Sequence, residues 1–99
     1  MEPNTGTGAG HGVDWAARPS QAQGVEINKV ADGYIVYDPE RDRVHYLNHT
    51  AVLVLEFCTG KVTAREIPEL LRSAYDLSTP PTEEVAQCLA RFYEEGLVR

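Results

Sequence analysis

Apolar and polar residues alternate along the first part of the chain that can form regular structure. Val25-Glu26-Ile27-Asn28 has a period of two, which is typical of a half-buried β-strand. Tyr34-Ile35-Val36-Tyr37 is rich in aromatic and β-branched residues, and residues 43–47 form a third such segment. The connections, Ala31-Asp32-Gly33 and residues 38–42, are short and polar. Because short connections join antiparallel neighbours, we predict a three-stranded meander whose first and last strands are both edges.

The pattern changes after residue 47, where the apolar residues become almost continuous. Residues 51–58 contain a single charged residue, and a segment that is apolar on every side must be covered on every side. Asn48 is a suitable N-cap, and Gly60 stands where a left-handed residue would close the last turn. The β-branched Val52 and Val54 weakly favour a strand. The caps and the length favour a helix of about three turns, which we place at the centre of the core.

A second helix is predicted after Gly60. Thr63 and Glu66 have the spacing of a capping box, which marks a helix start. Pro68 indicates either a distorted first turn or a helix that begins later than the box suggests. The predicted apolar face of this helix consists of Ile67, Leu70, Leu71 and Ala74.

Pro80-Pro81 excludes a continuous helix at that point, so a third helix is predicted to follow, with Thr82 as its cap and Gly96 at its end. Leu97 and Val98 are apolar enough to return to the core. The inner stripe of this helix is predicted to be Val85, Cys88, Leu89 and Phe92, and one flank of that stripe holds Ala86, Ala90 and Tyr93.

Residues 1–24 have a different composition, with many small and polar residues and with glycines at positions 6, 8, 10, 12 and 24. Such a segment cannot bury enough surface to offset its chain entropy, so we predict a disordered tail. The folded domain is then residues 25–99. The tail holds the only tryptophan, Trp15, which either docks on the domain or remains a stray aromatic in a mobile tail; the composition favours the second alternative.

Composition and charge exclude several function classes. Ninety-nine residues allow one small domain, which leaves little room for a large catalytic cleft. The formal charge of -6 disfavours nucleic acids and anionic membrane surfaces as partners. There is no apolar run of the roughly 20 residues that span a bilayer, and the first 24 residues do not resemble a signal peptide, so we expect a cytoplasmic protein.

The candidates for chemistry are few. Cys58 and Cys88 fall at apolar positions of predicted helices, which favours two reduced, buried thiols over a disulfide or a nucleophile. His45 and His49 are four residues apart, but the junction between strand and helix separates them. A metal site normally needs three or four convergent ligands. We therefore predict no metal, no cofactor and no enzymatic activity.

Strands followed by helices in so short a chain predict an α+β fold, a three-stranded antiparallel sheet followed by three helices, similar to a winged helix-turn-helix domain. Four motifs then resemble the PqqD-like family: residues 33–40, His45-Tyr46-Leu47-Asn48-x-Thr50-Ala51, Gly60-x-x-Thr63-x-x-Glu66-Ile67, and Glu95-Gly96-Leu97-Val98. That family comprises peptide chaperones of pyrroloquinoline quinone biosynthesis and the related recognition elements of ribosomally made, post-translationally modified peptides (RiPPs). The resemblance covers residues 25–99.

The resemblance implies a non-catalytic module that binds the leader segment of a precursor peptide and presents it to a tailoring enzyme, often a radical SAM maturase. In the family, the leader adds as a strand to the third strand and lies between it and the third helix. One departure is Asn48, where members of the pyrroloquinoline quinone pathway often carry an acidic residue. Carried onto this sequence, the peptide-binding residues are Arg43, Val44, His45, Tyr46 and Leu47 of the strand, and Ala86, Leu89, Ala90 and Tyr93 of the helix.

Two other functions stay open at this point. A winged-helix structural or regulatory protein could self-associate through the same edge strand, whereas the peptide-binding hypothesis predicts a monomer or a weak homodimer. Winged helices also bind DNA, but Arg91 is the only basic residue of the predicted third helix, which carries four acidic residues, Glu83, Glu84, Glu94 and Glu95. Arg43 fits either a peptide site or a charged residue that discourages aggregation of the edge.

Overall fold

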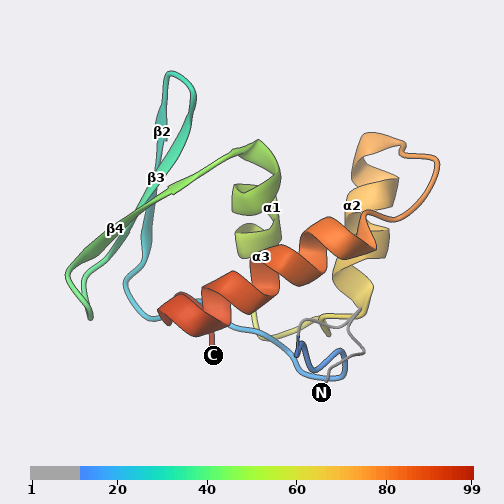
Figure 1. The fold of residues 1–99 in the computed structure, drawn as a ribbon, viewed down its shortest axis with the longest axis horizontal. Coiled ribbons are helices and arrows are strands. Elements are labelled where there is room, and N and C mark those ends of the chain that lie inside the picture. The colour runs from blue at the N-terminus through green and yellow to red at the C-terminus, as the bar shows by residue number, and fades with distance from the viewer. Residues whose placement is uncertain (1–11) are drawn as a thin grey trace, which may run out of the picture.

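The computed structural model describes residues 12–99, in which three strands are followed by three helices (Figure 1). The predicted α+β fold is confirmed, with an antiparallel sheet on one side of the helices. The elements are β2 (Glu26–Val30), β3 (Gly33–Asp38) and β4 (Arg43–Leu47), then α1 (His49–Phe57), α2 (Glu66–Tyr75) and α3 (Thr82–Glu95).

The sheet has the strand order β2-β3-β4, so β2 and β4 are its edges, as predicted. A two-residue turn places Val30 opposite Gly33, and the turn of residues 39–42 places Asp38 opposite Arg43. Side chains alternate between the two faces of a strand. On the face toward the helices, Val36, Asp38, His45 and Leu47 are buried.

The N-terminus of α1 is capped as predicted, since Asn48 Oδ1 accepts a hydrogen bond from the Ala51 N–H at 2.8 Å. The C-terminus differs from the prediction. The Cys58 N–H bonds to the Leu55 carbonyl at 3.0 Å, and the chain leaves the helix there. Gly60 has a left-handed φ of 83°, but it lies beyond the end of α1 and its N–H donates to the Pro19 carbonyl. The assignment of Gly60 as the residue that closes the helix is therefore wrong.

The start of α2 keeps one half of the predicted capping box. Glu66 Oε1 accepts hydrogen bonds from the backbone N–H and the hydroxyl of Thr63, at 2.7 and 3.2 Å. These bonds, the one from the backbone first, hold the pKa of the Glu66 carboxyl below its usual range. Because α2 begins at Glu66, Pro68 falls in the first turn, where no backbone donor is needed. The helix thus begins later than the box suggested.

The apolar face of α2 is narrower than predicted. Ile67 and Leu71 are buried, but Leu70 and Ala74 are exposed. Only the middle of the predicted apolar face packs against the rest of the domain, and its edges are exposed to solvent.

The third helix also begins differently, because Thr82 is its first helical residue and Pro81 occupies the cap position without a side-chain hydrogen bond. The prediction that Thr82 is the cap is wrong. The end is as predicted: Gly96 has a φ of 75°, and its N–H bonds to the Phe92 and Tyr93 carbonyls. In the predicted inner stripe, Val85, Leu89 and Phe92 are buried and Cys88 is partly buried.

The largest difference from the sequence prediction is at the N-terminus. Residues 13–22, here called the N-terminal strap, pack on the domain, so the prediction of disorder is wrong for them. The part of that prediction on residues 1–11 lies outside the described residues. Trp15 packs against the hydrophobic core, which decides between the two alternatives for this residue in favour of docking.

Backbone hydrogen bonds hold the strap between two other segments. On one side, the N–H groups of Arg65, Ala64 and Gly60 donate to carbonyls of the strap at 2.8 to 3.0 Å. On the other side, Ser20 and Arg99 exchange two hydrogen bonds, and the Ala22 N–H donates to the Leu97 carbonyl at 2.7 Å. A strap rich in small residues can thus be fixed by its main chain, which a count of apolar side chains does not detect.

The core lies between the sheet, the three helices and the C-terminal residues. Leu97 and Val98 are buried in it, as predicted. Cys58 and Cys88 are both free. Each helix between residues 12 and 99 is too short or too polar to cross a lipid bilayer.

Candidate functional site

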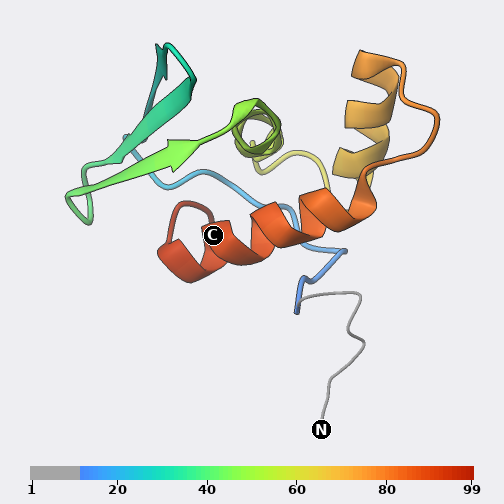
Figure 2. The ribbon, with the colours of Figure 1, turned by 45° about the horizontal axis from the view of Figure 1, so that its top comes forward.

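β4 is the strand from which the candidate site is built. One of its sides pairs with β3, and within residues 12–99 no strand pairs with the other side (Figure 2). An unpaired side of a strand presents main-chain N–H and C=O groups to any extended chain that approaches.

The turn between β2 and β3 fixes the direction of these groups. Val30 and Gly33 flank a two-residue turn. In such a hairpin the two flanking residues form a hydrogen-bonded pair, so we infer that the backbone groups of Gly33 point toward β2. Successive residues of a strand point to opposite sides. Tyr34 therefore points toward β4, where its partner is Leu47.

The same alternation applies along β4. Since Leu47 bonds to β3, His45 and Arg43 do so too, and Val44 and Tyr46 direct their N–H and C=O groups to the open side. The side chains of Val44 and Tyr46 are 64% and 53% exposed, on the face of the sheet away from the helices. The open side of β4 thus offers two donors and two acceptors.

The C-terminal half of α3 is tied to the middle of β4. His45 Nδ1 lies 3.1 Å from Glu95 Oε1, which also accepts a hydrogen bond from Arg91 Nε at 3.3 Å. His45 is only 6% exposed, and its Nε2 has no hydrogen-bond partner among the described residues. This contact fixes the spacing between the edge strand and the helix beside it.

A second set of contacts fixes the N-terminal end of β4. The guanidinium of Arg41, in the turn before β4, packs against Gly96, where a Cβ would collide with it. Glu40 in the same turn forms an ion pair with Arg99. The β3–β4 turn is thereby attached to the end of α3 and to the C-terminal residues.

A hollow of about 350 Å³ lies between one face of α3 and the start of α1, directly after the end of β4, and its lining includes no residue of β4 itself. We call it the β4–α3 groove. Figures 1 and 2 both show α3 running from the end of α2 past α1 to the sheet. The lining residues come from the start of α1 and from one face of α3: Asn48, Thr50 and Ala51, and Glu84, Gln87, Cys88 and Arg91.

The predicted helix residues do not line this groove. Ala86 and Leu89 are fully buried in the core, so they cannot contact a bound peptide in this structure. Ala90 and Tyr93 line a separate hollow, which they share with Asp14, Ala17 and Arg99. The resemblance to the family was carried onto the flank of α3 that lies beside the N-terminal strap.

The residues that sequence reasoning missed are Gln87, Cys88 and Arg91 on the opposite flank. The signal was weak, because Cys88 was assigned to the buried stripe and only the structure shows it to be partly buried, with Gln87 and Arg91 exposed beside it. The periodicity gives two flanks and does not say which one meets β4. The five predicted strand residues form β4, in which Arg43, Val44 and Tyr46 are exposed and His45 and Leu47 are buried.

The ionisable groups near the site are not arranged for catalysis by a thiol. Burial raises the pKa of the Cys58 thiol to about 12, and burial also raises the pKa of Cys88. Both therefore stay protonated near neutral pH, and a protonated thiol is a poor nucleophile. In the part of the chain that the structure describes, no three His, Cys, Asp or Glu residues are grouped so that they could hold a metal ion.

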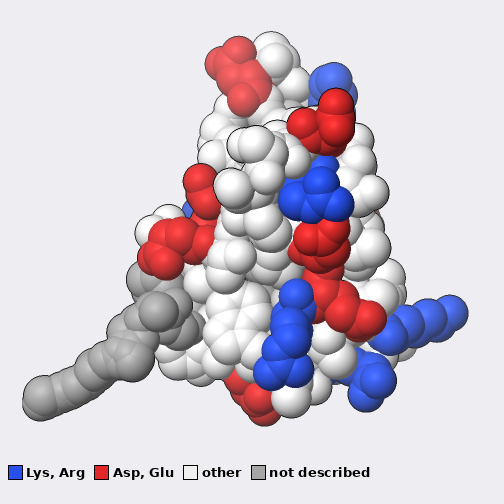
Figure 3. All heavy atoms as spheres, turned by 90° about the vertical axis from the view of Figure 1, so that its right-hand side faces the viewer, with Lys and Arg blue, Asp and Glu red and all other residues white. Residues whose placement is uncertain are grey.

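Charges are mixed rather than uniformly basic. On the side formed by α2 and the turn after it, acidic and basic side chains lie next to each other beside a broad uncharged surface (Figure 3). The exposed residues of α3 include Glu83, Glu84 and Glu94. A helix that enters DNA needs basic groups toward the phosphates, so these observations do not favour DNA binding.

Comparisons with known proteins agree with this fold. The family described as coenzyme PQQ synthesis protein D (PqqD) matches residues 33–98. A search of solved structures finds the solution NMR structure of the PqqD truncation of Methylobacterium extorquens PqqCD, described as a functional and stand-alone RiPP recognition element. The TM-score is 0.63 with 24% identity, over 82% of this chain and 87% of that one, which shows a shared fold. A comparison with curated proteins finds no match.

Proposed function

This chain belongs to the PqqD family, and from that premise we propose that it binds the leader segment of a ribosomally made precursor peptide by strand addition to β4. The protein then presents the bound peptide to a tailoring enzyme, often a radical SAM maturase, and has no catalytic role of its own. The open side of β4, with outward N–H and C=O groups at Val44 and Tyr46, is the observation that carries this proposal.

The energetics indicate that strand pairing is not sufficient. Two residues of β4 offer four main-chain hydrogen bonds to a guest strand. At about 1 kcal/mol net each, they contribute about 4 kcal/mol, which corresponds to a Kd near 1 mM. Tighter binding requires that side chains of the guest bury apolar surface beside the strand. The β4–α3 groove supplies such a place, next to Ala51 and Cys88.

The direct test is a titration of isotope-labelled protein with synthetic leader peptides, chosen from precursor genes that neighbour its own. We expect backbone amide signals of Val44 and Tyr46 to shift together with those of Gln87, Cys88 and Arg91. Shifts confined to α2, or the absence of any leader that binds more tightly than about 1 mM, would contradict the proposal.

A matched pair of variants tests the hydrogen-bonding direction. Val44→Pro removes one outward N–H from the open side of β4 without deleting a bond to β3. Val44→Ala keeps the N–H and removes most of the side chain. We expect the proline variant to bind the leader up to about tenfold more weakly than the alanine variant, the value of one hydrogen bond. Equal affinities of the two variants would show that the guest does not pair with β4.

The same exposed edge supports a second candidate, in which two copies pair through β4 as a structural or regulatory dimer. Val44 and Tyr46 would then meet their counterparts across a two-fold axis. Sedimentation over a range of protein concentrations distinguishes the two. A dimer that forms without peptide, and that Val44→Pro abolishes but Val44→Ala does not, supports self-association; a monomer at all concentrations excludes it.

A further inference from the structure

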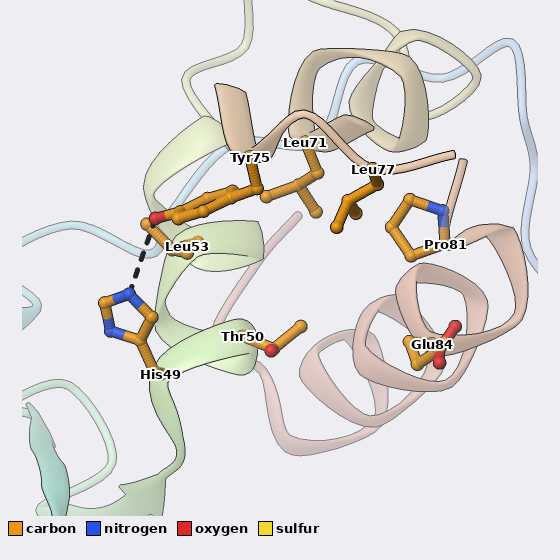
Figure 4. A pocket seen from close by; sticks show the side chains of 8 residues that line it. All are labelled: His49, Thr50, Leu53, Leu71, Tyr75, Leu77, Pro81 and Glu84. Atoms are coloured by element: carbon orange, nitrogen blue, oxygen red, sulfur yellow. Dashed lines mark hydrogen bonds between the residues drawn. The ribbon is translucent and has the colours of Figure 1, made fainter. Parts of the chain in front are cut away.

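A second hollow, of about 330 Å³, lies among the three helices (Figure 4). Leu53 of α1, Leu71 and Tyr75 of α2, and Leu77 and Pro81 from the connection to α3 surround it. Figure 4 shows these side chains directed toward a common opening, with Thr50 and Glu84 on the opposite side. We call it the interhelical hollow.

The interhelical hollow adjoins the β4–α3 groove. Thr50 and Glu84 line both, one on α1 and the other on α3. Near the C-terminus of α3, Glu95 contacts His45 of β4. Further toward its N-terminus, Cys88 and Glu84 line the groove together with the first turn of α1. A peptide that leaves the edge of β4 along the groove therefore arrives at the hollow.

The chemistry of the hollow suits an apolar side chain. Tyr75 and Leu77 are 46% and 38% exposed, so the hollow leaves large apolar side chains in contact with solvent. Its volume is near the lower end of ligand pockets in proteins, about 300–1,000 Å³. This size suits one or two side chains of a peptide better than a large cofactor.

One wall of the hollow is held in place by hydrogen bonds. The Tyr75 hydroxyl lies 3.4 Å from His49 Nε2, and the Tyr34 hydroxyl lies 3.3 Å from His49 Nδ1. The rings of Tyr34 and His49 are also stacked, with centroids 5.9 Å apart. His49 thus links β3, α1 and α2, which keeps the Tyr75 ring at the rim of the hollow.

We propose that the interhelical hollow anchors one apolar side chain, such as leucine, isoleucine, methionine or phenylalanine, of the peptide that pairs with β4. This proposal rests on the proposed function and adds a requirement on the guest: a strand-forming segment followed or preceded by an apolar anchor outside it. The reason is adjacency, because the groove begins at Asn48, directly after β4, and shares Thr50 and Glu84 with the hollow. Burial of such a side chain strengthens binding by about 10- to 100-fold.

The test is a selection from a displayed library of random peptides of about 12 residues, long enough to span a strand and a further segment. Peptides that bind the wild-type protein are sequenced, synthesised and measured individually. We expect an apolar residue at a fixed distance from the strand-forming segment. Replacing that residue by serine should weaken binding to the wild-type protein by about 10- to 100-fold.

Variants of the hollow decide where that residue binds. Thr50→Trp places a large ring at the junction, and Leu77→Ser removes one wall; both positions are solvent-accessible, so the fold should tolerate the changes. Glu56→Trp puts the same ring on an exposed position of α1 outside the lining of both hollows and is the matched control. With Thr50→Trp and Leu77→Ser, the serine-substituted and parent peptides should bind equally well, whereas Glu56→Trp should keep the difference.

The outcomes separate this inference from the proposed function. If peptides are selected and Val44→Pro weakens them, but no apolar anchor emerges or its effect survives in both hollow variants, the anchoring site is wrong and strand addition stands. If the wild-type protein selects no peptide, or Val44→Pro has no effect on the peptides selected, the proposed function fails and this inference fails with it.

Discussion

The two flanks of α3 have similar positions beside the same buried stripe, yet the fold treats them differently. The flank of Ala90 and Tyr93 lies beside the N-terminal strap and lines a hollow together with it, and the strap is held by main-chain hydrogen bonds to segments on either side. The flank of Gln87, Cys88 and Arg91 faces β4 and the start of α1, and the described residues leave it open. One flank lies next to the N-terminal strap of the same chain, and the other has no such neighbour among the described residues that line its groove.

An extended segment can therefore pack beside α3 on either of its two flanks. The strap reaches its place without a long apolar run, because backbone hydrogen bonds and one docked ring, Trp15, hold it. We propose that a leader peptide is held on the other flank by the same means, with main-chain bonds to β4 and a few buried side chains. The predictions below separate the two flanks, beginning with the change that affects both.

The largest effect is expected for Phe92→Ala. Phe92 is fully buried on the stripe between the two flanks, so the loss of its ring leaves a cavity beneath both. The free energy of unfolding should fall by about 3–5 kcal/mol. Urea denaturation measures the change, and Leu70→Ala, at an exposed position of α2, is the control. A decrease in the free energy of unfolding below about 1 kcal/mol would contradict a central role of this stripe in stability.

A smaller effect is expected for Trp15→Ala, which acts on the strap alone. Trp15 is partly buried against the core, so the free energy of unfolding should fall by about 2 kcal/mol. The affinity for a leader peptide should not change, because Trp15 is remote from the groove lining. Trp15→Phe retains a ring and should lose less. If Trp15→Ala weakened peptide binding but not stability, the assignment of the two flanks would be reversed.

The third prediction introduces the same ring on each flank in turn. Gln87→Trp, at an exposed position, fills the β4–α3 groove and should weaken leader binding by more than about tenfold, with a change in stability within about 0.5 kcal/mol. Ala90→Trp crowds the strap and should cost about 1–3 kcal/mol of stability. Peptide titration gives the affinity of each variant for the leader, and thermal unfolding gives its stability. Peptide binding that is lost equally in both variants would remove the distinction.

The smallest effects concern the two cysteines. Cys58 is buried and its carbonyl bonds to the strap residue Gln21, whereas Cys88 is partly buried in the groove. We expect an alkylating reagent at pH 8 to modify Cys88 slowly and Cys58 more slowly still, because burial raises the pKa of both thiols. Bound leader peptide should protect Cys88 further. Mass spectrometry of each site measures this, and faster labelling of Cys58 would contradict the placement.

The Cys58 thiol also predicts a dependence of stability on pH. Its pKa is about 12 in the folded protein, above the ordinary value of 9.0 that applies to the unfolded chain. The unfolded chain therefore loses this proton first, so the contribution of Cys58 to stability is complete below pH 9 and decreases as the pH rises toward 12. Comparison of the unfolding free energies of the wild-type protein and Cys58→Ala between pH 8 and pH 10 reveals it. A constant difference would contradict the shift.

Most of the fold follows from local patterns. The period-two segments became β2, β3 and β4, and the Asn48 cap and the Gly96 end were placed correctly, because each depends on residues only a few positions apart. The error at Thr82 is local, whereas the error at Gly60 comes from a contact with a residue far away in the sequence. Each residue type fits the predicted role, but Gly60 is engaged with Pro19, and Pro81 already occupies the cap position of α3.

The sequence by itself determined the three strands and the position of the first and the last at the edges of the sheet, since alternation and turn length are properties of neighbouring residues. Only the tertiary structure decided which flank of α3 faces that edge. The choice depends on Trp15, Ser20 and Ala22 reaching the segments around Arg65, Arg99 and Leu97, which are far away in the sequence. Contacts of this kind arise from the packing of the whole chain, and a helical period that offers two equivalent flanks contains no information about them.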